Sequence, residues 1–197
     1  MKIYLTDQSK HFPEHLEFLK KQPVMKYDKA GLIEKTTVIP VNTNKELHEL
    51  DTRFLFDYEI FPSSIMTFLT QWHLEKRNMQ VGDTIVQQVF VPPFRKFSQK
   101  IIFGVRINDI VNEPTRIGFS YETLKGHVEK GISTFTVEKT GDFGLSFQVH
   151  TFSMPGNLLS NLVGPIFSVP YQTYCTGQGL ANWKNHEGGL CMYLLVR

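Results

Sequence analysis

Three polar residues on one predicted strand are the sharpest candidates for chemistry in this sequence. Tyr121 and Thr123 stand two positions apart, so their side chains point to the same side of a strand, and His127 follows at the turn made by Gly126. A histidine titrates near neutral pH and a phenol donates a hydrogen bond, so the set can hold the polar end of a ligand or act as acid and base. The alternative is structural: His127 can bond the backbone of its turn, and Tyr121 and Thr123 can belong to a cross-strand ladder.

A large aromatic content accompanies these residues, with 16 Phe against 2 Trp. Inward-facing phenylalanines on neighbouring predicted strands can line a cavity, and an ordinary packed core is the equal alternative. The candidate lining residues are Phe103, Phe119, Phe135, Phe147 and Phe152. Gln172 and Tyr174, on a predicted C-terminal helix, can bring polar groups to the mouth of such a cavity.

Other reactive residue types do not form a recognisable site. Two His/Glu pairs occur at a spacing of two, the first being His73 and Glu75, but no third ligand stands nearby, so we expect no metal. Glycine-rich phosphate and dinucleotide motifs are absent, so we expect no cofactor. The two cysteines, Cys175 and Cys191, are too far apart for a Cys-x-x-Cys motif and are expected to be reduced thiols.

The composition predicts one globular domain with at most an extension. The chain has 197 residues, 41% of them hydrophobic and 20% charged, with a formal net charge of +2. That charge is too small and too dispersed for a nucleic-acid binder. The N-terminus lacks a secretory signal, and the most apolar stretch, 158–171, is too interrupted to span a membrane. We therefore expect a cytoplasmic protein, and the sequence leaves its oligomeric state open.

The first half of the chain predicts four elements. Apolar residues within 7–22 follow a helical spacing, and Thr36–Val41 predicts a short edge strand because Pro40 cannot donate to a ladder. Alternating aromatic residues predict a strand over Arg53–Phe61. Spacings of three and four after Pro62 predict a helix that ends near 78–82.

Beyond Gly82 the periodicity is two, which predicts consecutive antiparallel strands. The expected strands cover 84–91, 100–111, 116–124, 131–138 and 143–152, and the last two should form a hairpin. After them, a stripe from Leu158 to Phe167 predicts a helix facing the sheet, bent at Gly164-Pro165 and continuing to about residue 185. The expected division is an N-terminal extension 1–50, a domain 51–186 and an apolar tail 187–197.

A longer pattern around the three polar residues resembles a known family. It reads Gly118-Phe119-Ser120-Tyr121-Glu122-Thr123-Leu124-Lys125-Gly126-His127 and continues with Gly131, Phe135, Phe152-Ser153-Met154-Pro155, Gly164-Pro165, Gln172 and Tyr174. The pattern is similar to domain-of-unknown-function family 1990, also called uncharacterised protein family 0548, over about residues 61–183. Where that family tends to carry Gly-Glu-Glu after its Gly-His motif, this chain has Gly131-Ile132-Ser133.

The resemblance implies a fold and a class of ligand. The family is similar to the Bet v 1 and START-like (SRPBCC) superfamily, which implies an α+β helix-grip fold: a curved antiparallel β-sheet wrapped around a long C-terminal helix, enclosing an apolar cavity. It does not imply a reaction, because function inferred from fold alone is an analogy.

Three functional hypotheses follow. The first is a non-enzymatic module that binds a small apolar or amphipathic molecule in the cavity, with Tyr121, Thr123 and His127 at its polar end. The second is a cyclase, dehydratase or hydrolase in which His127 is the general base and Tyr121 a hydrogen-bond donor. The third is a protein-interaction module without an open cavity, in which the extension or the tail contacts a partner.

Overall fold

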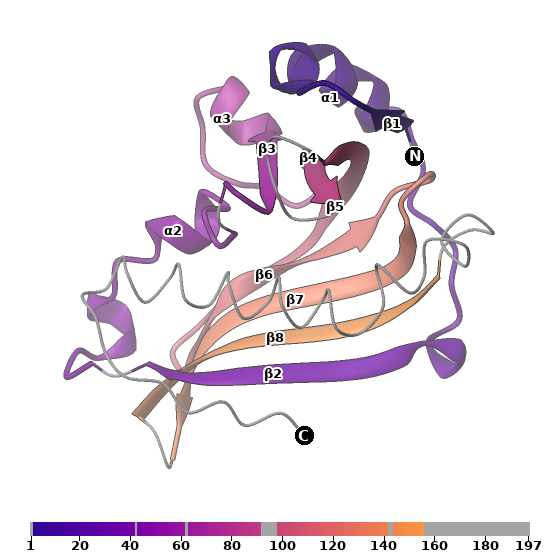
Figure 1. Ribbon diagram of the computed structural model, residues 1–197. Coiled ribbons are helices and arrows are strands. Elements are labelled where there is room, and N and C mark those ends of the chain that lie inside the picture. The colour runs from indigo at the N-terminus through magenta and orange to yellow at the C-terminus, as the bar shows by residue number, and fades with distance from the viewer. Residues whose placement is uncertain (1, 42, 62, 92–97, 142–143, 156–197) are drawn as a thin grey trace.

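The computed structural model describes residues 2–41, 43–61, 63–91, 98–141 and 144–155, and these build one eight-stranded antiparallel sheet. Seven strands follow the order β2-β8-β7-β6-β5-β4-β3, and β1 pairs with β5 beside this path. Figure 1 shows the long strands β6, β7, β8 and β2 lying side by side in a curved layer. The strands are β1 (Lys2–Tyr4), β2 (Ile33–Val41), β3 (Met66–Thr70), β4 (Thr84–Val91), β5 (Gln99–Glu113), β6 (Arg116–Thr123), β7 (Glu129–Thr140) and β8 (Gly144–Pro155).

The predicted run of antiparallel strands is confirmed. Strands β4 to β8 pair each with the next, and β7 and β8 form the expected hairpin, from Glu129 opposite Pro155 to Thr140 opposite Gly144. The bounds of β4 coincide with the predicted ones. Short polar turns such as the one between β5 and β6 leave antiparallel pairing as the simplest connection, which is why alternation alone predicts this part correctly.

The predicted N-terminal helix and edge strand are also confirmed. The helix is α1 (Phe12–Lys20), preceded by the 3-10 turn η1 (Ser9–His11). Among the described strands, β2 pairs with β8 alone, and Pro40 stands opposite Ser146 at this edge, where a missing N–H is tolerated. The first fifty residues therefore contribute β1 and β2 to the sheet, and the division of the chain at residues 50 and 186 stays a prediction.

Two predictions between residues 53 and 78 are wrong. Residues 53–61 do not form a strand: they form the short helix α2 (Arg53–Phe56) followed by turns. The predicted helix after Pro62 is replaced by β3 and then by the single turn α3 (Gln71–Leu74). Thr70 ends β3 and caps α3, because its side-chain oxygen accepts the backbone N–H of His73 at 3.3 Å. Two further 3-10 turns, η2 (Lys29–Gly31) and η3 (Leu47–Glu49), lie in connections.

Apolar side chains gather on both faces of the sheet. We call the face that carries Phe119 and Phe135 the inner face, and the face that carries Val86 and Ile102 the outer face. The inner face holds the larger cluster, to which α2 contributes Phe54 in edge-on contact with Phe147, with ring centroids 6.4 Å apart. All eight residues of β4 are buried, because this strand is covered on both faces.

Helix α1 covers the outer face of β3, β4 and β5 (Figure 1). Its buried residues Phe12, Leu16 and Leu19 pack against Val86 and Ile102. The contact is close: a Cβ added to Gly104 would lie 2.9 Å from a methyl group of Leu19. The predicted C-terminal helix, its bend and the tail lie outside the described residues.

Candidate functional site

Tyr58 is the most unusual residue of the inner face. It follows α2 in the left-handed region, with φ of 64°, where glycine is the favoured residue. The backbone N–H of Glu59 reaches back to the carbonyl of Phe54 at 2.8 Å, and the N–H of Tyr58 reaches the carbonyl of Leu55 at 3.2 Å, which is a Schellman motif. Since the left-handed conformation costs a bulky residue about 1–2 kcal/mol, the side chain of Tyr58 must supply a compensating interaction.

That interaction is a buried group of polar side chains. The amide Nε2 of Gln87, on β4, donates to the hydroxyl of Tyr58 at 2.5 Å, and both residues are almost completely buried. Tyr121 of β6 lies beside them, with its ring centroid 6.3 Å from that of Tyr58, and it stands opposite Ser133 of β7. Thr151 of β8 donates to Ser133 of β7 at 3.2 Å. We call these five residues the inner polar network.

The network is embedded in aromatic rings. Tyr58 stands perpendicular to Phe68, with centroids 5.1 Å apart, and lies 6.1 Å from Phe119. Phe119 and Phe135 stack at 5.3 Å, and Tyr121 also lies 5.3 Å from Phe135. Burial raises the pKa of both Tyr58 and Tyr121 above the usual value of a phenol, so both hydroxyls keep their hydrogens at neutral pH.

One row of residues extends this group to the edge of the sheet. The register places Tyr121, Ser133, Thr151 and Lys35 next to one another on successive strands β6, β7, β8 and β2. Burial lowers the pKa of Lys35, and the negative charge of Glu129 opposes that shift. The same charge raises the pKa of Tyr121 further. The row therefore runs from a phenol to an ammonium group, with Glu129 acting on both.

Thr123 and His127 have a different role from Tyr121. The hydroxyl of Thr123 accepts the backbone N–H of Gly131 at 3.0 Å across the strands. The ring Nδ1 of His127 accepts the backbone N–H of Glu129 at 3.0 Å, and the backbone N–H of His127 donates to the carbonyl of Leu124 at 3.0 Å. Both side chains thus hold backbone between β6 and β7, as the structural alternative proposes. Burial lowers the pKa of His127 to about 3, which makes it a weak base.

The predicted phenylalanines divide among three places. Phe119 and Phe135 surround the inner polar network. Phe103 lies against His127, with ring centroids 4.2 Å apart, and Phe147 packs on Phe54 of α2. Phe152 does not belong to the inner face, because the alternation of β8 turns it to the outer face, where it lies against His150 at 4.6 Å. Gln172 and Tyr174 lie outside the described residues.

Residues 37–182 match the family described as Domain of unknown function (DUF1990). The chain belongs to this family. A stretch of 72 residues is 32% identical to a UPF0548 protein of Deinococcus radiodurans. That stretch covers 36% of this chain and 36% of the Deinococcus radiodurans protein, so it spans about a third of each.

The DUF1990 match includes all five residues of the inner polar network and leaves α1 and Lys35 outside. Four members of the network escape prediction from the sequence: Tyr58, Gln87, Ser133 and Thr151. Gln87 carries a usable signal, because it interrupts the apolar alternation of Ile85 and Val89 on the inner face. The other three members are brought together by the register of the paired strands, and that register cannot be inferred from the sequence alone.

Two further properties concern the described part of this DUF1990 chain. None of its helices is long and apolar enough to cross a membrane. Within the same residues, His, Asp and Glu side chains form no group of three or more that could hold a metal ion.

Proposed function

We propose that this chain adopts a helix-grip fold and binds a small apolar or amphipathic molecule over the inner face of its sheet. In this proposal the segment after β8, with its predicted apolar stripe from Leu158 to Phe167, covers the inner face, and the ligand lies between the two. The antiparallel order of β4 to β8 and the aromatic inner face support the proposal.

The observation that carries the proposal is the inner polar network inside an aromatic cluster. Polar groups buried in an apolar core stabilise a protein less than well-packed apolar side chains of the same volume, because they must first lose their hydration. The left-handed backbone of Tyr58 adds a further energetic cost to that of burying these polar groups. A group of hydroxyls and one amide, held in place by a strained residue, is suited to orient the polar end of a ligand whose remainder contacts Phe119 and Phe135.

The geometry favours binding over catalysis by the residues the sequence singles out. A general base works best with a pKa near the working pH, whereas the pKa of His127 lies at about 3 and its Nδ1 is engaged with the backbone of Glu129. Both phenols of the network have raised pKa values, so they act as hydrogen-bond donors and acceptors rather than as bases.

Native mass spectrometry of the purified full-length chain tests the proposal. We expect a protein ion with an added small-molecule mass under gentle conditions, and the loss of that mass when the activating energy rises. If the protein is empty as purified, it is incubated with a total lipid extract and measured again. An ion that carries no added mass in either experiment would contradict the proposed binding function.

A further inference from the structure

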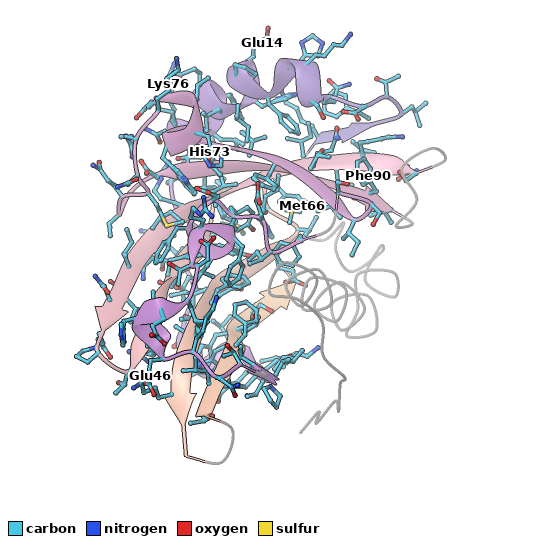
Figure 2. The ribbon with its side chains drawn as sticks, turned by 90° about the vertical axis from the view of Figure 1, so that its left-hand side faces the viewer. Glu14, Glu46, Met66, His73, Lys76 and Phe90 are labelled. Atoms are coloured by element: carbon cyan, nitrogen blue, oxygen red, sulfur yellow. The ribbon has the colours of Figure 1, made fainter. Side chains whose placement is uncertain are left out.

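Lys100 is a buried lysine at the start of β5. Ile101 and Phe103 lie on the inner face, so the alternation of the strand turns Lys100 to the outer face. There it stands opposite Tyr4 of β1 and Phe90 of β4, and Phe90 is labelled in Figure 2. Lys100 is 4% exposed, although lysine is among the residue types that are least often buried. A charge in such a place requires partners.

The ammonium group of Lys100 has three hydrogens, and two of them are bound by the backbone. Nζ donates to the carbonyl oxygen of Ser98 at 2.6 Å and to that of Leu5 at 3.1 Å. Among the described residues, no acceptor takes the third hydrogen and no carboxylate forms an ion pair with Nζ. Two neutral carbonyls do not balance a full charge, and a buried charge without an opposite charge is strongly unfavourable.

Asp7 is the acidic residue nearest in the sequence to the Leu5 carbonyl, but its Oδ1 faces another partner. This oxygen accepts the side-chain amide of Gln88 at 3.1 Å. The side-chain oxygen of Gln88, which is fully buried, accepts the backbone N–H of Gln8 at 2.7 Å. These bonds hold the N-terminal segment in place beside Lys100, so the Leu5 carbonyl is a fixed acceptor for its ammonium group.

A buried hydroxyl without a partner accompanies the third hydrogen of Lys100. Ser98 is 4% exposed, and its Oγ is buried without a hydrogen-bond partner. Buried hydroxyls are rarely left unpaired, because they have lost their hydration. Nζ of Lys100 contacts the carbonyl of Ser98 itself, and Oγ is only a few covalent bonds from that carbonyl. The two residues therefore offer two hydrogen-bond donors and one positive charge in the same region of the outer face.

We infer that Lys100 and Ser98 bind a small inorganic oxyanion, such as phosphate. Nζ supplies the positive charge and one hydrogen bond, and Oγ supplies a second hydrogen bond. An oxyanion has several acceptor oxygens and carries the opposite charge, so it satisfies both donors and balances the ammonium group. A water molecule would accept the same hydrogens but would leave the charge unbalanced. This site lies on the outer face of the sheet, so it is separate from the binding function proposed for the inner face.

The melting temperature of the full-length protein in increasing concentrations of sodium phosphate tests this inference. The pH is held at 7.5, and sodium chloride keeps the ionic strength constant. Above the dissociation constant, and up to about 100 mM phosphate, each tenfold increase should raise the melting temperature by about 3–5 °C. Lys100→Met removes the charge and keeps a side chain of similar length, so it should abolish this rise. Ser98→Ala should move the curve to about tenfold higher phosphate concentrations.

Lys10→Met is the matched control. Lys10 is exposed in the 3-10 turn η1, so this variant removes the same charge from the surface and should respond to phosphate as the unaltered protein does. Phosphate also stabilises proteins because it is excluded from their surfaces. An equal rise in the unaltered protein and in Lys100→Met would show that effect alone and overturn the inference, as would a flat curve for the unaltered protein. If Lys100→Met does not fold, an unchanged curve for Ser98→Ala would overturn it.

Discussion

Tyr58 and Lys76 offer a direct measurement of what the inner polar network contributes. Both are non-glycine residues in the left-handed region, with φ of 64° and 53°, and both follow short helices in Schellman motifs. They differ in their side chains: Tyr58 is fully buried, whereas Lys76 is exposed and lies at the periphery of the molecule in Figure 2. Glycine at either position relieves the same backbone strain, but only at position 58 does it remove a packed, hydrogen-bonded ring.

The expected free energies follow from these differences. Relief of the left-handed strain stabilises the folded protein by about 1–2 kcal/mol. The greater conformational entropy of glycine in the unfolded chain offsets about 0.4–1 kcal/mol of that gain. Lys76→Gly should therefore raise the free energy of unfolding by about 0.5–1 kcal/mol. Tyr58→Gly has the same gain but loses a buried aromatic side chain, worth about 3–5 kcal/mol, so it should lower the free energy of unfolding by about 2–4 kcal/mol.

Urea unfolding followed by tryptophan fluorescence measures both variants, since Trp72 is buried next to this region. Tyr58→Phe completes the set: it keeps the ring and the strain, leaves Gln87 without its acceptor, and should destabilise by about 1–3 kcal/mol. If Tyr58→Gly were as stable as the unaltered protein, the side chain would contribute nothing that outweighs the strain. The left-handed backbone at Tyr58 would then have no compensation from the inner polar network.

Three further predictions address the framework of the site. Gly131→Ala should destabilise the protein by about 3 kcal/mol in the same urea assay, because its Cβ would lie 1.9 Å from the carbonyl oxygen of Phe152. Gly31→Ala is the control: the space around Gly31 is open, so this variant should be as stable as the unaltered protein. His127 has a pKa of about 3 when folded and 6.5 when unfolded, so stability should fall as the pH drops from 6.5 towards 3, by up to about 1.4 kcal/mol per pH unit. His127→Gln should flatten that slope, and an unchanged slope would contradict a buried neutral imidazole. Removal of residues 2–25 should expose the outer-face cluster beneath α1 and lower the melting temperature; an unchanged melting temperature would show that α1 adds nothing to the fold.

The second half of the described chain was predictable because its strands alternate clearly. In β5, Ile101, Phe103 and Val105 lie on the inner face, with Ile102 and Gly104 between them on the outer face, and polar turns mark the ends of most strands. One signal, the period of two, is enough to find such strands and to predict antiparallel neighbours. Most of the errors come from short apolar segments, where two periodicities fit equally well.

The segment 65–72 illustrates this ambiguity. Phe68 packs into the inner cluster and Leu69 against the outer one, so β3 buries consecutive residues on opposite faces. The apolar spacing then resembles that of a helix, although the residues form a strand. Residues 53–61 show the reverse: Phe54 and Tyr58 fit an alternating strand, yet they lie four apart on the same side of α2 and the turn that follows it.

The candidate site was predictable only in part. Tyr121 could be chosen from its position beside Thr123 and His127, but those two residues bind backbone. Tyr121 instead packs against Tyr58 and Phe135, which come from other segments of the chain. Such partners are brought together by the register of the sheet and by the strained turn at Tyr58. Neither feature can be derived from the residue types alone, because register depends on the whole set of strand pairs.

The pairing of β2 with β8 has a consequence for how the chain folds during synthesis. Glu34 of β2 and His150 of β8 meet at 2.8 Å although they are 116 residues apart in the sequence. At roughly 5–20 residues per second, β2 leaves the ribosome several seconds before its partner strand exists. During that interval β2 is an unpaired strand that other nascent chains could join, and Pro40 and the charged pair Glu34-Lys35 are residues that discourage such pairing. Closure of the sheet is therefore expected to be a late, slow step, because it waits for the pairing of two strands that are far apart in the sequence.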